Sequence, residues 1–255
     1  MREYQAPADL LKQRVILITG AGDGIGRAAA LSFARHGATV ILLGKTVRKL
    51  EQVYDEIVDA GGPQPAIYPM NLEGATATDY QELARNIEAQ LGRLDGILHN
   101  AAFLGSLTPL ELYDMELWTR VMQINLHAAY LLTRACLPLL KQAEDASVLF
   151  TSSEVGRQGE AYWGAYAISN AAVENMMQIF ADEMETNTHI RFNSIDPGAV
   201  ATAMRRRAFP GEDPNTLPAP DTIMPVYLYL MGPDSQDTNG QSISAQSPSP
   251  ARDCR

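Results

Sequence analysis

A glycine-rich turn between an apolar run and an amphipathic one is the feature that most constrains the fold. Residues Val15–Thr19 are apolar or β-branched, the loop Thr19–Gly26 carries four glycines, and a helical pattern then runs over Gly24–His36. Glycine permits tight turns and lets backbone amides approach a phosphate, while the start of a helix attracts negative charge. This segment therefore predicts the first strand-turn-helix unit of a dinucleotide-binding parallel sheet.

The rest of the chain repeats this alternation of short strand-like runs and longer helical ones. Such alternation is typical of a parallel sheet covered by helices on both faces, and 255 residues are an ordinary length for one such domain. We predict a single doubly wound α/β domain of the Rossmann type, residues 1–255, with a mostly parallel seven-stranded sheet. The predicted strands are Val15–Thr19, Thr39–Leu43, Ala66–Pro69, Gly96–Asn100, Ser147–Ser152, Arg191–Asp196 and Ser242–Ala245. The predicted helices are Gly24–His36, Val47–Ala60, Thr76–Leu91, Met115–Lys141, Tyr162–Glu185 and Asp221–Met231.

Two segments interrupt the alternation. Residues 198–220 are rich in proline, glycine and charge, and they follow the carboxyl end of a predicted strand, where ligands bind in open sheets. We expect this segment to form a mobile lid over the substrate. Residues 247–255 contain a Ser-Pro-Ser-Pro run at the end of the chain, and we expect a disordered tail there.

Composition argues against several classes of function. Acidic residues outnumber basic ones by 30 to 20, which disfavours a nucleic-acid partner. The chain has no apolar run of about eighteen residues and no basic start followed by an apolar segment, so we expect neither a membrane span nor export. Cys136 and Cys254 are too few and too far apart for a disulfide framework, so we expect the protein to lie in a reducing cytoplasm. No residue spacing in the sequence suggests a metal site.

The chemistry of the chain centres on Ser153 and Tyr166, which are spaced like the hydroxyl pair of a carbonyl-reducing site. A tyrosine that exchanges a proton with an alcohol starts from a pKa near 10, and a cation at i+4 on its helix would lower that pKa. That position holds Asn170, a neutral amide. Lysine occurs only at positions 12, 45, 49 and 141, so no lysine on this helix can replace the cation. Arg157 is the nearest cation in sequence, and ordinary loop geometry would point it outward.

Together these motifs resemble the short-chain dehydrogenase/reductase family over nearly the whole chain. The matching segments are Thr19 with Gly20-x-x-x-Gly24-x-Gly26, Asn100-Ala101-Ala102, Asn125, Ser153, Tyr166 and Pro197-Gly198 with Thr202. Within the family, Gly156–Gly159, Trp163–Tyr166 and Ala208–Pro210 are most similar to the YciK-type oxidoreductases of bacteria. The family uses a nicotinamide cofactor to transfer a hydride between a carbonyl compound and an alcohol.

The resemblance implies a role for each matching residue. Ser153 would hydrogen-bond the substrate oxygen, Tyr166 would deliver the proton, and Asn125 would hold a water in the relay to solvent. The family lysine that Asn170 replaces both holds the ribose hydroxyls and lowers the tyrosine pKa, so we expect a rate lower by about 10²–10⁴. The expected cofactor contacts are Thr19, Gly20, Gly22, Asp23, Gly24, Ile25, Gly26, Lys45, Asn71, Asn100, Ala101, Pro197, Gly198 and Thr202.

The sequence favours NADP(H) over NAD(H). An NAD-selective member would end its second strand with an acidic residue, whereas here Lys45, with Arg48 nearby, could meet a 2′-phosphate. Asp23 argues the other way, because many NADP-preferring relatives have a basic residue at that position.

Two functions remain open at this point. One is an NADP(H)-dependent carbonyl reductase or alcohol dehydrogenase acting on a small molecule. The other is a non-catalytic protein that binds NADP(H) and acts through a partner or as a sensor. Helices 115–141 and 162–185 are more apolar than one covered face requires, and relatives pair such helices, so we expect a homodimer or homotetramer. Phe103, Leu104, Tyr162 and Trp163 suggest an apolar or aromatic substrate wall.

Overall fold

A single parallel sheet organises the protein, seen here in a computed structural model that describes residues 1–246. Its seven strands follow the order β3-β2-β1-β4-β5-β6-β7, and all neighbours pair in parallel. The predicted fold class is thereby confirmed, with a sheet that is parallel throughout. Strand order reverses between β1 and β4, which is where open α/β sheets bind ligands. The expected tail at 247–255 lies outside the described residues.

The element bounds follow the predicted ones closely. The strands are β1 (Val15–Thr19), β2 (Thr39–Gly44), β3 (Ala66–Pro69), β4 (Gly96–His99), β5 (Ala146–Thr151), β6 (Ile190–Asp196) and β7 (Ser242–Ser244). The α-helices are α1 (Gly24–Arg35), α2 (Val47–Asp59), α3 (Ala77–Leu91), α4 (Met115–Met122), α5 (Ala128–Leu140), α6 (Glu154–Arg157), α7 (Gly164–Glu185), α8 (Ala203–Ala208) and α9 (Met224–Met231). Short helical turns are η1 (Leu110–Leu112), η2 (Gln123–His127), η3 (Pro214–Thr216), η4 (Pro220–Ile223) and η5 (Pro233–Ser235).

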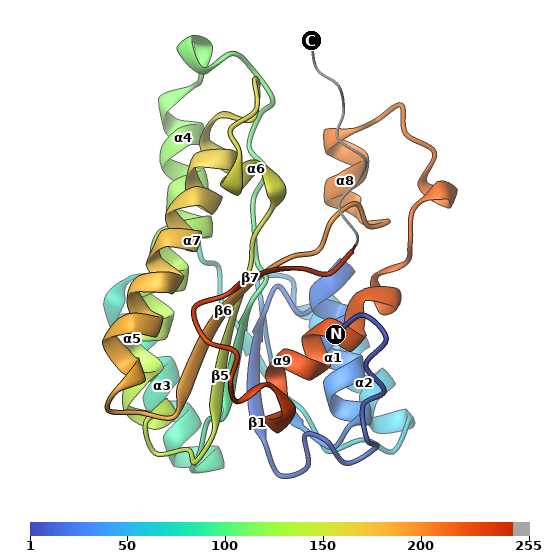
Figure 1. Ribbon diagram of the computed structural model, residues 1–255, viewed down its shortest axis with the longest axis vertical. Coiled ribbons are helices and arrows are strands. Elements are labelled where there is room, and N and C mark those ends of the chain that lie inside the picture. The colour runs from blue at the N-terminus through green and yellow to red at the C-terminus, as the bar shows by residue number, and fades with distance from the viewer. Residues whose placement is uncertain (247–255) are drawn as a thin grey trace.

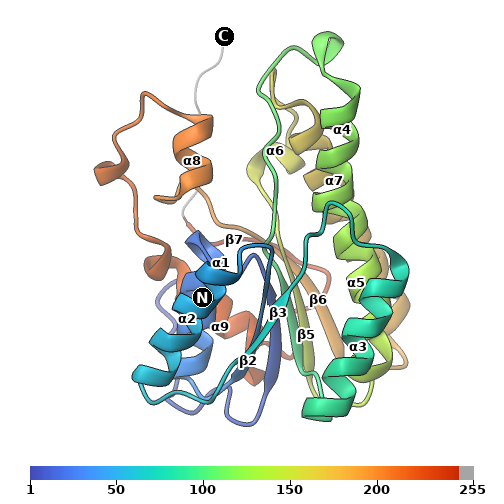
Figure 2. The same cartoon turned by 180° about the vertical axis from the view of Figure 1, so that it is seen from behind.

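Helices cover both faces of the sheet, as Figures 1 and 2 show from opposite sides. One apolar core joins the sheet to α1, α2 and α9, and a second joins it to α3, α5 and α7. Strands β1, β2, β4 and β5 are largely apolar because both of their faces are covered, and every residue of β1 is buried. The inner strand β6 differs, since it carries Arg191, Asn193, Ser194 and Asp196. Within residues 1–246, no helix combines the length and apolar character needed to cross a bilayer.

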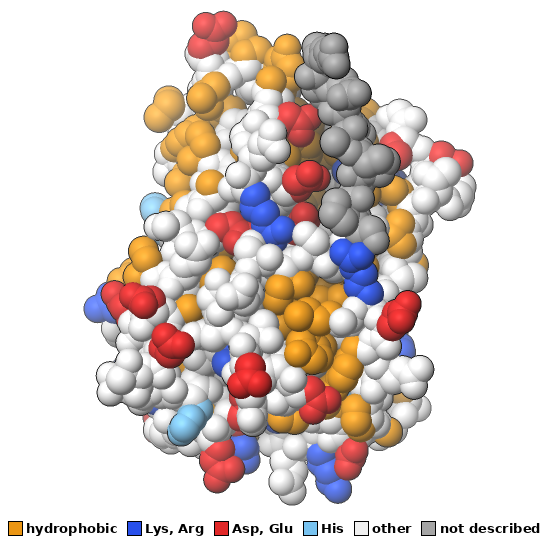
Figure 3. Space-filling model, in the orientation of Figure 1, with side chains coloured by type: hydrophobic (Ala, Val, Ile, Leu, Met, Phe, Trp, Pro, Cys, Tyr) orange, Lys and Arg blue, Asp and Glu red, His pale blue; other side chains and the backbone are white. Residues whose placement is uncertain are grey.

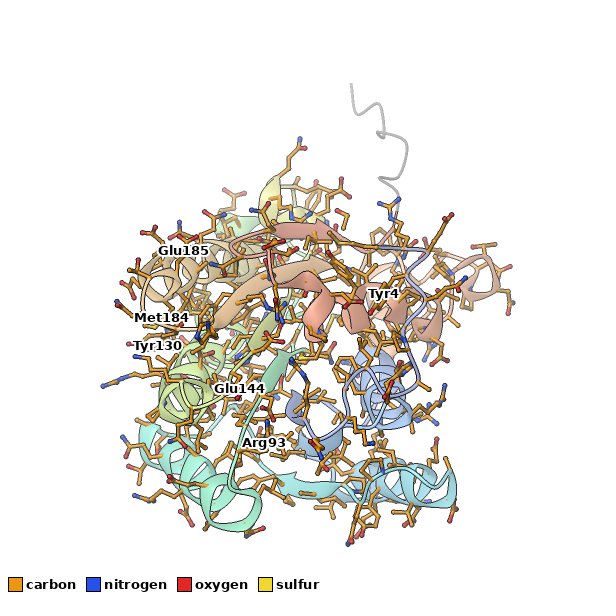
Figure 4. The ribbon with its side chains drawn as sticks, turned by 60° about the horizontal axis from the view of Figure 1, so that its bottom comes forward. Tyr4, Arg93, Tyr130, Glu144, Met184 and Glu185 are labelled. Atoms are coloured by element: carbon orange, nitrogen blue, oxygen red, sulfur yellow. The ribbon has the colours of Figure 1, made fainter. Side chains whose placement is uncertain are left out.

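A buried arginine holds together the edge of the sheet at which the strands begin. Arg191, 5% exposed, donates hydrogen bonds to Asp145 at 2.9 Å, to the Leu230 carbonyl at 3.0 Å and to the Gly232 carbonyl at 3.1 Å. Figure 4 looks toward this edge, where Arg93 and Glu144 lie in the loops before β4 and β5. The contacts of Arg191 tie the loop before β5 to the C-terminal end of α9.

Three local features depart from the sequence prediction. The predicted helix 115–141 contains a π turn, η2, between α4 and α5. Helix α7 starts at Gly164 instead of Tyr162, whose backbone takes the left-handed value φ +74°. The segment expected as a lid contains helix α8, which rises above the carboxyl edge of the sheet opposite the start of α7 (Figures 1 and 2). All three lie near the carboxyl edge, where the candidate site is found.

Candidate functional site

The loop after β1 is packed so tightly that Gly20 and Gly26 leave no room for a side chain. Gly20 has φ +68°, and a Cβ placed at Gly26 would lie 2.3 Å from the Gly20 carbonyl oxygen and 2.6 Å from Asn100 Nδ2. Helix α1 begins at Gly24, so the positive end of its dipole lies at this loop. A loop of bare backbone at a helix start is a suitable cradle for a pyrophosphate.

Thr19 joins the two strands that flank the point of strand reversal. Its Oγ1 accepts hydrogen bonds from the backbone amides of Asn100 and Ala101, both at 3.0 Å. Asn100 Nδ2 in turn donates to the Thr19 carbonyl at 3.4 Å. Ile25 is half-buried and packs against the core beneath the loop. These contacts set the floor of the crevice between β1 and β4.

Asp23 is paired with a lysine at the rim of this loop. Its Oδ1 accepts the Gly24 amide at 2.8 Å, and its Oδ2 accepts a hydrogen bond from Lys49 Nζ at 2.5 Å. The Lys49 hydrogen bond is the main cause that lowers the pKa of Asp23, and the Gly24 amide and the Arg206 charge act in the same direction. Gly22 lies against the same lysine, since a Cβ there would be 2.8 Å from Lys49 Cβ. The negative charge that argued against a 2′-phosphate therefore lies beside a positive one.

Lys45 and Asn71 lie exposed just beyond the carboxyl ends of β2 and β3. Because these strands pair in register from Ile41 with Ala66 to Gly44 with Pro69, the two residues share one edge of the sheet with the glycine loop. Asn71 Oδ1 accepts the amide of Glu73 at 3.3 Å. Both residues therefore lie at the carboxyl edge, the edge at which open α/β sheets bind ligands.

The turn after β6 brings the expected lid over the glycine loop. Gly198 has φ +70°, and Gln246 Nε2 donates to the carbonyls of Pro197 and Ala199, each at 2.8 Å. Thr202 caps α8 by accepting the amide of Arg205 at 3.1 Å. A Cβ at Gly24 would lie 3.5 Å from the Thr202 methyl group, so the start of α8 stands directly over the loop.

The structure brings the two candidate hydroxyls together. Ser153 occupies the N-cap position of α6 after β5, Tyr166 lies in the first turn of α7, and Ser153 lies close enough to act on the pKa of Tyr166. The two helices touch closely, since a Cβ at Gly156 would lie 2.6 Å from Asn170 Cβ. The short glycine-containing α6 thus allows Ser153, Tyr166 and Asn170 to share one small space.

Asn170 does not supply what a cation would. Its side chain is almost fully buried, and Nδ2 donates to the backbone carbonyl of Tyr166 at 2.9 Å. Burial raises the pKa of Tyr166, the hydrogen bonds with Asn170 and Ser153 oppose that rise, and the negative charge of Asp196 adds to it. Among the groups within residues 1–246 that act on this pKa, none is positively charged. Tyr166 is therefore a weaker acid than free tyrosine.

The cation nearest in sequence is held elsewhere. Arg157 donates to Glu174 at 3.2 Å and to the Ser244 hydroxyl at 3.1 Å, which directs its guanidinium toward β7. Glu174 also accepts the hydroxyls of Ser194 at 2.6 Å and Ser242 at 2.7 Å. Burial would raise the pKa of Glu174, but these hydroxyls and the Arg157 charge outweigh burial and lower it.

Two acidic residues near the tyrosine were missed by the sequence reasoning. Asp196, at the end of β6, accepts the Gly198 amide at 2.9 Å, and burial raises the pKa of its carboxyl group. Glu174 lies on α7 eight residues after Tyr166, so residues 166, 170 and 174 share one face of the helix. That helical spacing was a signal for Glu174, and the position of Asp196 directly before Pro197-Gly198 was a signal for Asp196.

Asn125 uses its whole side chain to tie the site together. Oδ1 accepts the Phe103 amide at 2.8 Å, and Nδ2 donates to the Phe103 carbonyl at 3.1 Å and to Ser169 Oγ at 3.0 Å. It lies in the π turn η2, a form of helix often found at functional sites. The side chain thereby joins the segment after β4 to the tyrosine helix.

A small cavity lies behind the tyrosine helix. It measures about 20 Å³, and Asn125, Asn170, Thr151 and His99 are among its lining residues. A water molecule requires about 10–15 Å³ measured in this way and two to four polar partners, so one water fits there. His99 is packed in the interior, where it hydrogen-bonds Thr133 at 2.8 Å and burial lowers its pKa to about 3.

Comparison with known proteins gives a consistent set of relatives. Residues 14–213 match the model of the short chain dehydrogenase family. The uncharacterized oxidoreductase YciK of Escherichia coli K12 is 50% identical over 243 residues, which are 95% of this chain and 96% of YciK. A short chain dehydrogenase structure from Pseudomonas syringae is 56% identical with a TM-score of 0.94, covering 96% of this chain and 99% of that one. Another, from Shigella flexneri 2a and complexed with NADP, is 50% identical with a TM-score of 0.92, covering 94% and 100%.

Proposed function

Because the chain belongs to the short-chain dehydrogenase/reductase family of oxidoreductases, we propose that it uses NADP(H) to interconvert a small carbonyl compound and its alcohol. The resemblance to YciK-type oxidoreductases drawn from the sequence is confirmed by the 50% identity to that protein. The observation that carries the proposal is that the Thr19–Gly26 cradle and the neighbouring side chains of Ser153 and Tyr166 lie at one edge of the sheet.

The cofactor is NADP(H). The relative from Shigella flexneri 2a was solved with NADP, and here the second strand ends at Gly44-Lys45 without a carboxylate. The exposed Lys45 directly follows the second strand and could meet a 2′-phosphate, and Asp23 is held by Lys49. The cradle fits a dinucleotide because Gly20 and Gly26 leave no room for side chains that would fill it. When bound, the nicotinamide ring supplies or accepts the hydride.

The side chains of this protein position the substrate and move the proton. Ser153 donates a hydrogen bond to the substrate oxygen, which stabilises its developing negative charge. Tyr166 gives the proton to that oxygen during reduction and takes it back during oxidation. The cavity that Asn125 and Asn170 line has room for one water, and we assign that water to the proton relay. Without a cation at position 170, each step runs more slowly than in a relative that has one.

The test combines a binding measurement with a turnover measurement. NADPH binding is followed by the fluorescence of the reduced cofactor, and turnover by its oxidation with a panel of aldehydes and ketones. We expect the natural protein to bind NADPH and turn over slowly, and Tyr166→Phe to bind equally well with no turnover. A protein that does not bind NADPH, or whose turnover survives Tyr166→Phe, would contradict the proposal.

The raised pKa of Tyr166 favours one second candidate, a non-catalytic protein that binds NADP(H) and acts through a partner or as a sensor. In that case the cradle is retained while the proton donor has lost its activating cation. The same assay separates the two functions. Tight NADPH binding with no turnover, in both the natural protein and Asn170→Lys, would support the sensor.

We further propose a homodimer or homotetramer in the cytoplasm, formed through α4, α5 and α7. Figure 3 shows hydrophobic side chains gathered at the upper left, over α4 and the start of α7. The large apolar side chains exposed on these helices are Met115, Tyr130, Ile168 and Ile179. Cys136 is a buried free thiol, in keeping with a reducing compartment. A monomer at micromolar concentration in light scattering would exclude the oligomer.

A further inference from the structure

A row of three aromatic rings runs from Tyr166 through Trp163 to Phe209 in the lid. The Trp163 ring lies 5.8 Å from the Tyr166 ring on one side and 5.8 Å from the Phe209 ring on the other, tilted by 44° and 46°. We propose that Trp163 and Phe209 form the wall that binds the substrate beside Tyr166, and that they select an uncharged carbonyl compound carrying an apolar ring. This inference rests on the proposed function and adds the substrate class to it.

The backbone is strained in a way that fixes Trp163 in this position. Tyr162 takes φ +74°, which is unfavourable for a residue with a side chain, and Gly164 follows with φ +37°. The Tyr162 carbonyl accepts the amide of Thr108 at 3.0 Å, and a Cβ at Gly164 would lie 2.7 Å from the Tyr113 ring. Strain of this kind persists where surrounding contacts impose it, and it is common at ligand sites. Trp163 precedes Tyr166 by three residues, so both rings lie on one face of the helix start.

Phe209 reaches Trp163 from the opposite wall, at the end of α8. The Arg205 guanidinium lies over the Phe209 ring at 3.7 Å from its centre, and it donates twice to Glu212, at 2.6 and 2.7 Å. This bidentate pair holds the arginine and neutralises its charge. Arg205 therefore supports the aromatic ring.

The charges around Tyr166 disfavour an anionic substrate. The half-buried carboxylate of Asp196 raises the pKa of this tyrosine, and Glu154 and Glu174 act on Asp196 as further negative charges. The positive charge of Arg157 is held by Glu174. A carboxylate or phosphate beside Tyr166 would be repelled, whereas a neutral ring would gain contact with two aromatic faces.

The lid also contacts the cofactor side of the site. Thr202, at the start of α8, stands over Gly24, and the charge of Arg206 acts on Asp23. The same short segment thus extends from the dinucleotide loop to Phe209. A substrate carbonyl between these contacts would lie under the lid, with its ring against Trp163 and Phe209.

The experiment uses Trp163 as its own reporter. The chain has two tryptophans, so Trp118→Phe leaves Trp163 as the single one in the full-length protein. Its fluorescence is titrated, with and without saturating NADPH, using acetophenone, 2-butanone and acetoacetate as ring-bearing, small and anionic ketones. We expect acetophenone to bind most tightly and acetoacetate least. In the same background, Phe209→Ala should weaken acetophenone about two- to tenfold, the usual worth of an aromatic pair.

The matched control removes the cation over Phe209 and keeps the ring. Arg205→Met should leave the acetophenone affinity within about twofold, because the arginine supports the ring without contacting the substrate. The inference would be overturned if Phe209→Ala left the acetophenone affinity unchanged. It would also be overturned if the affinity rose, because the Phe209 ring would then be filling the site itself, or if acetoacetate bound in preference to acetophenone. Trp163 fluorescence reports binding whether or not the ketone is reduced. Acetophenone binding without reduction would therefore contradict the proposed enzymatic function and leave the proposed aromatic wall standing. NADPH binding without acetophenone binding would contradict the aromatic wall and leave the enzymatic function standing.

Discussion

Replacing Asn170 by lysine should restore part of the acidity that Tyr166 lacks. Positions i and i+4 of a helix lie about 5–6 Å apart, and a unit charge about 5 Å from the phenolate, at an effective dielectric constant of about 20, contributes about 3 kcal/mol. That free energy corresponds to about two pKa units and to about a hundredfold more tyrosinate at neutral pH. Asn170 is 6% exposed, so solvent would screen little of this interaction. Glu174 lies four residues after position 170 on the same helix, and its negative charge would favour the charged form of the introduced ammonium group.

The assay measures the Tyr166 pKa and the rate separately. Tyrosinate formation is followed by ultraviolet difference titration with Tyr166→Phe as the blank, and alcohol oxidation by NADP⁺ reduction near pH 7. Asn170→Gln lengthens the side chain without adding charge and serves as the matched control. We expect Asn170→Lys alone to lower the pKa by about two units and to raise the oxidation rate about a hundredfold. Equal behaviour of the lysine and glutamine variants would refute the electrostatic reasoning.

Three further perturbations test other parts of the structure. Gly26→Ala should abolish NADPH binding, because its Cβ would fall 2.3 Å from a carbonyl oxygen, whereas Gly74→Ala, with open space around it, should bind as the natural protein does. Asp196→Asn should lower the pKa of Tyr166, because the carboxylate of Asp196 raises it. The rising limb of the pH profile for alcohol oxidation should then move to lower pH. An unmoved limb would show that the charge of Asp196 does not act on the tyrosine. Arg191→Met should cost about 3–5 kcal/mol of unfolding free energy, as loss of one partner of a buried ion pair does, and a melting temperature lowered by less than about 3 °C would contradict that role.

The fold was predictable because its pattern is carried by local residues. Strands such as β1 are apolar from end to end, and glycine marks the turn that leads into α1. What the sequence did not reveal were α6 and α8, which are shorter than two helical turns and too short to show a hydrophobic period. The π turn around Asn125 was hidden as well, since one extra residue within a long apolar helix leaves its pattern almost unchanged.

The candidate site was predictable in its residues and less so in its electrostatics. Ser153, Tyr166 and Asn170 were identified by spacing, and the structure brings them together. The direction in which Arg157 points depends on its contacts with Glu174 and the β7 edge, and these are brought together only by the fold. The influence of Asp196 on Tyr166 likewise joins residues from β6 and α7. Such long-range pairs have no local pattern, so reasoning along the chain could not find them.

The raised pKa of Tyr166 bears differently on the two directions of the reaction. Reduction requires the protonated tyrosine, and raising its pKa extends the pH range over which it remains protonated. Oxidation requires the tyrosinate, which becomes scarcer at neutral pH by a factor of about ten for each unit. A weak but competent enzyme should therefore reduce carbonyls at a rate that stays level across neutral pH, while its oxidation rate rises steadily with pH. Because a protein that only binds NADPH gives neither profile, the shape of the pH dependence separates slow catalysis from none.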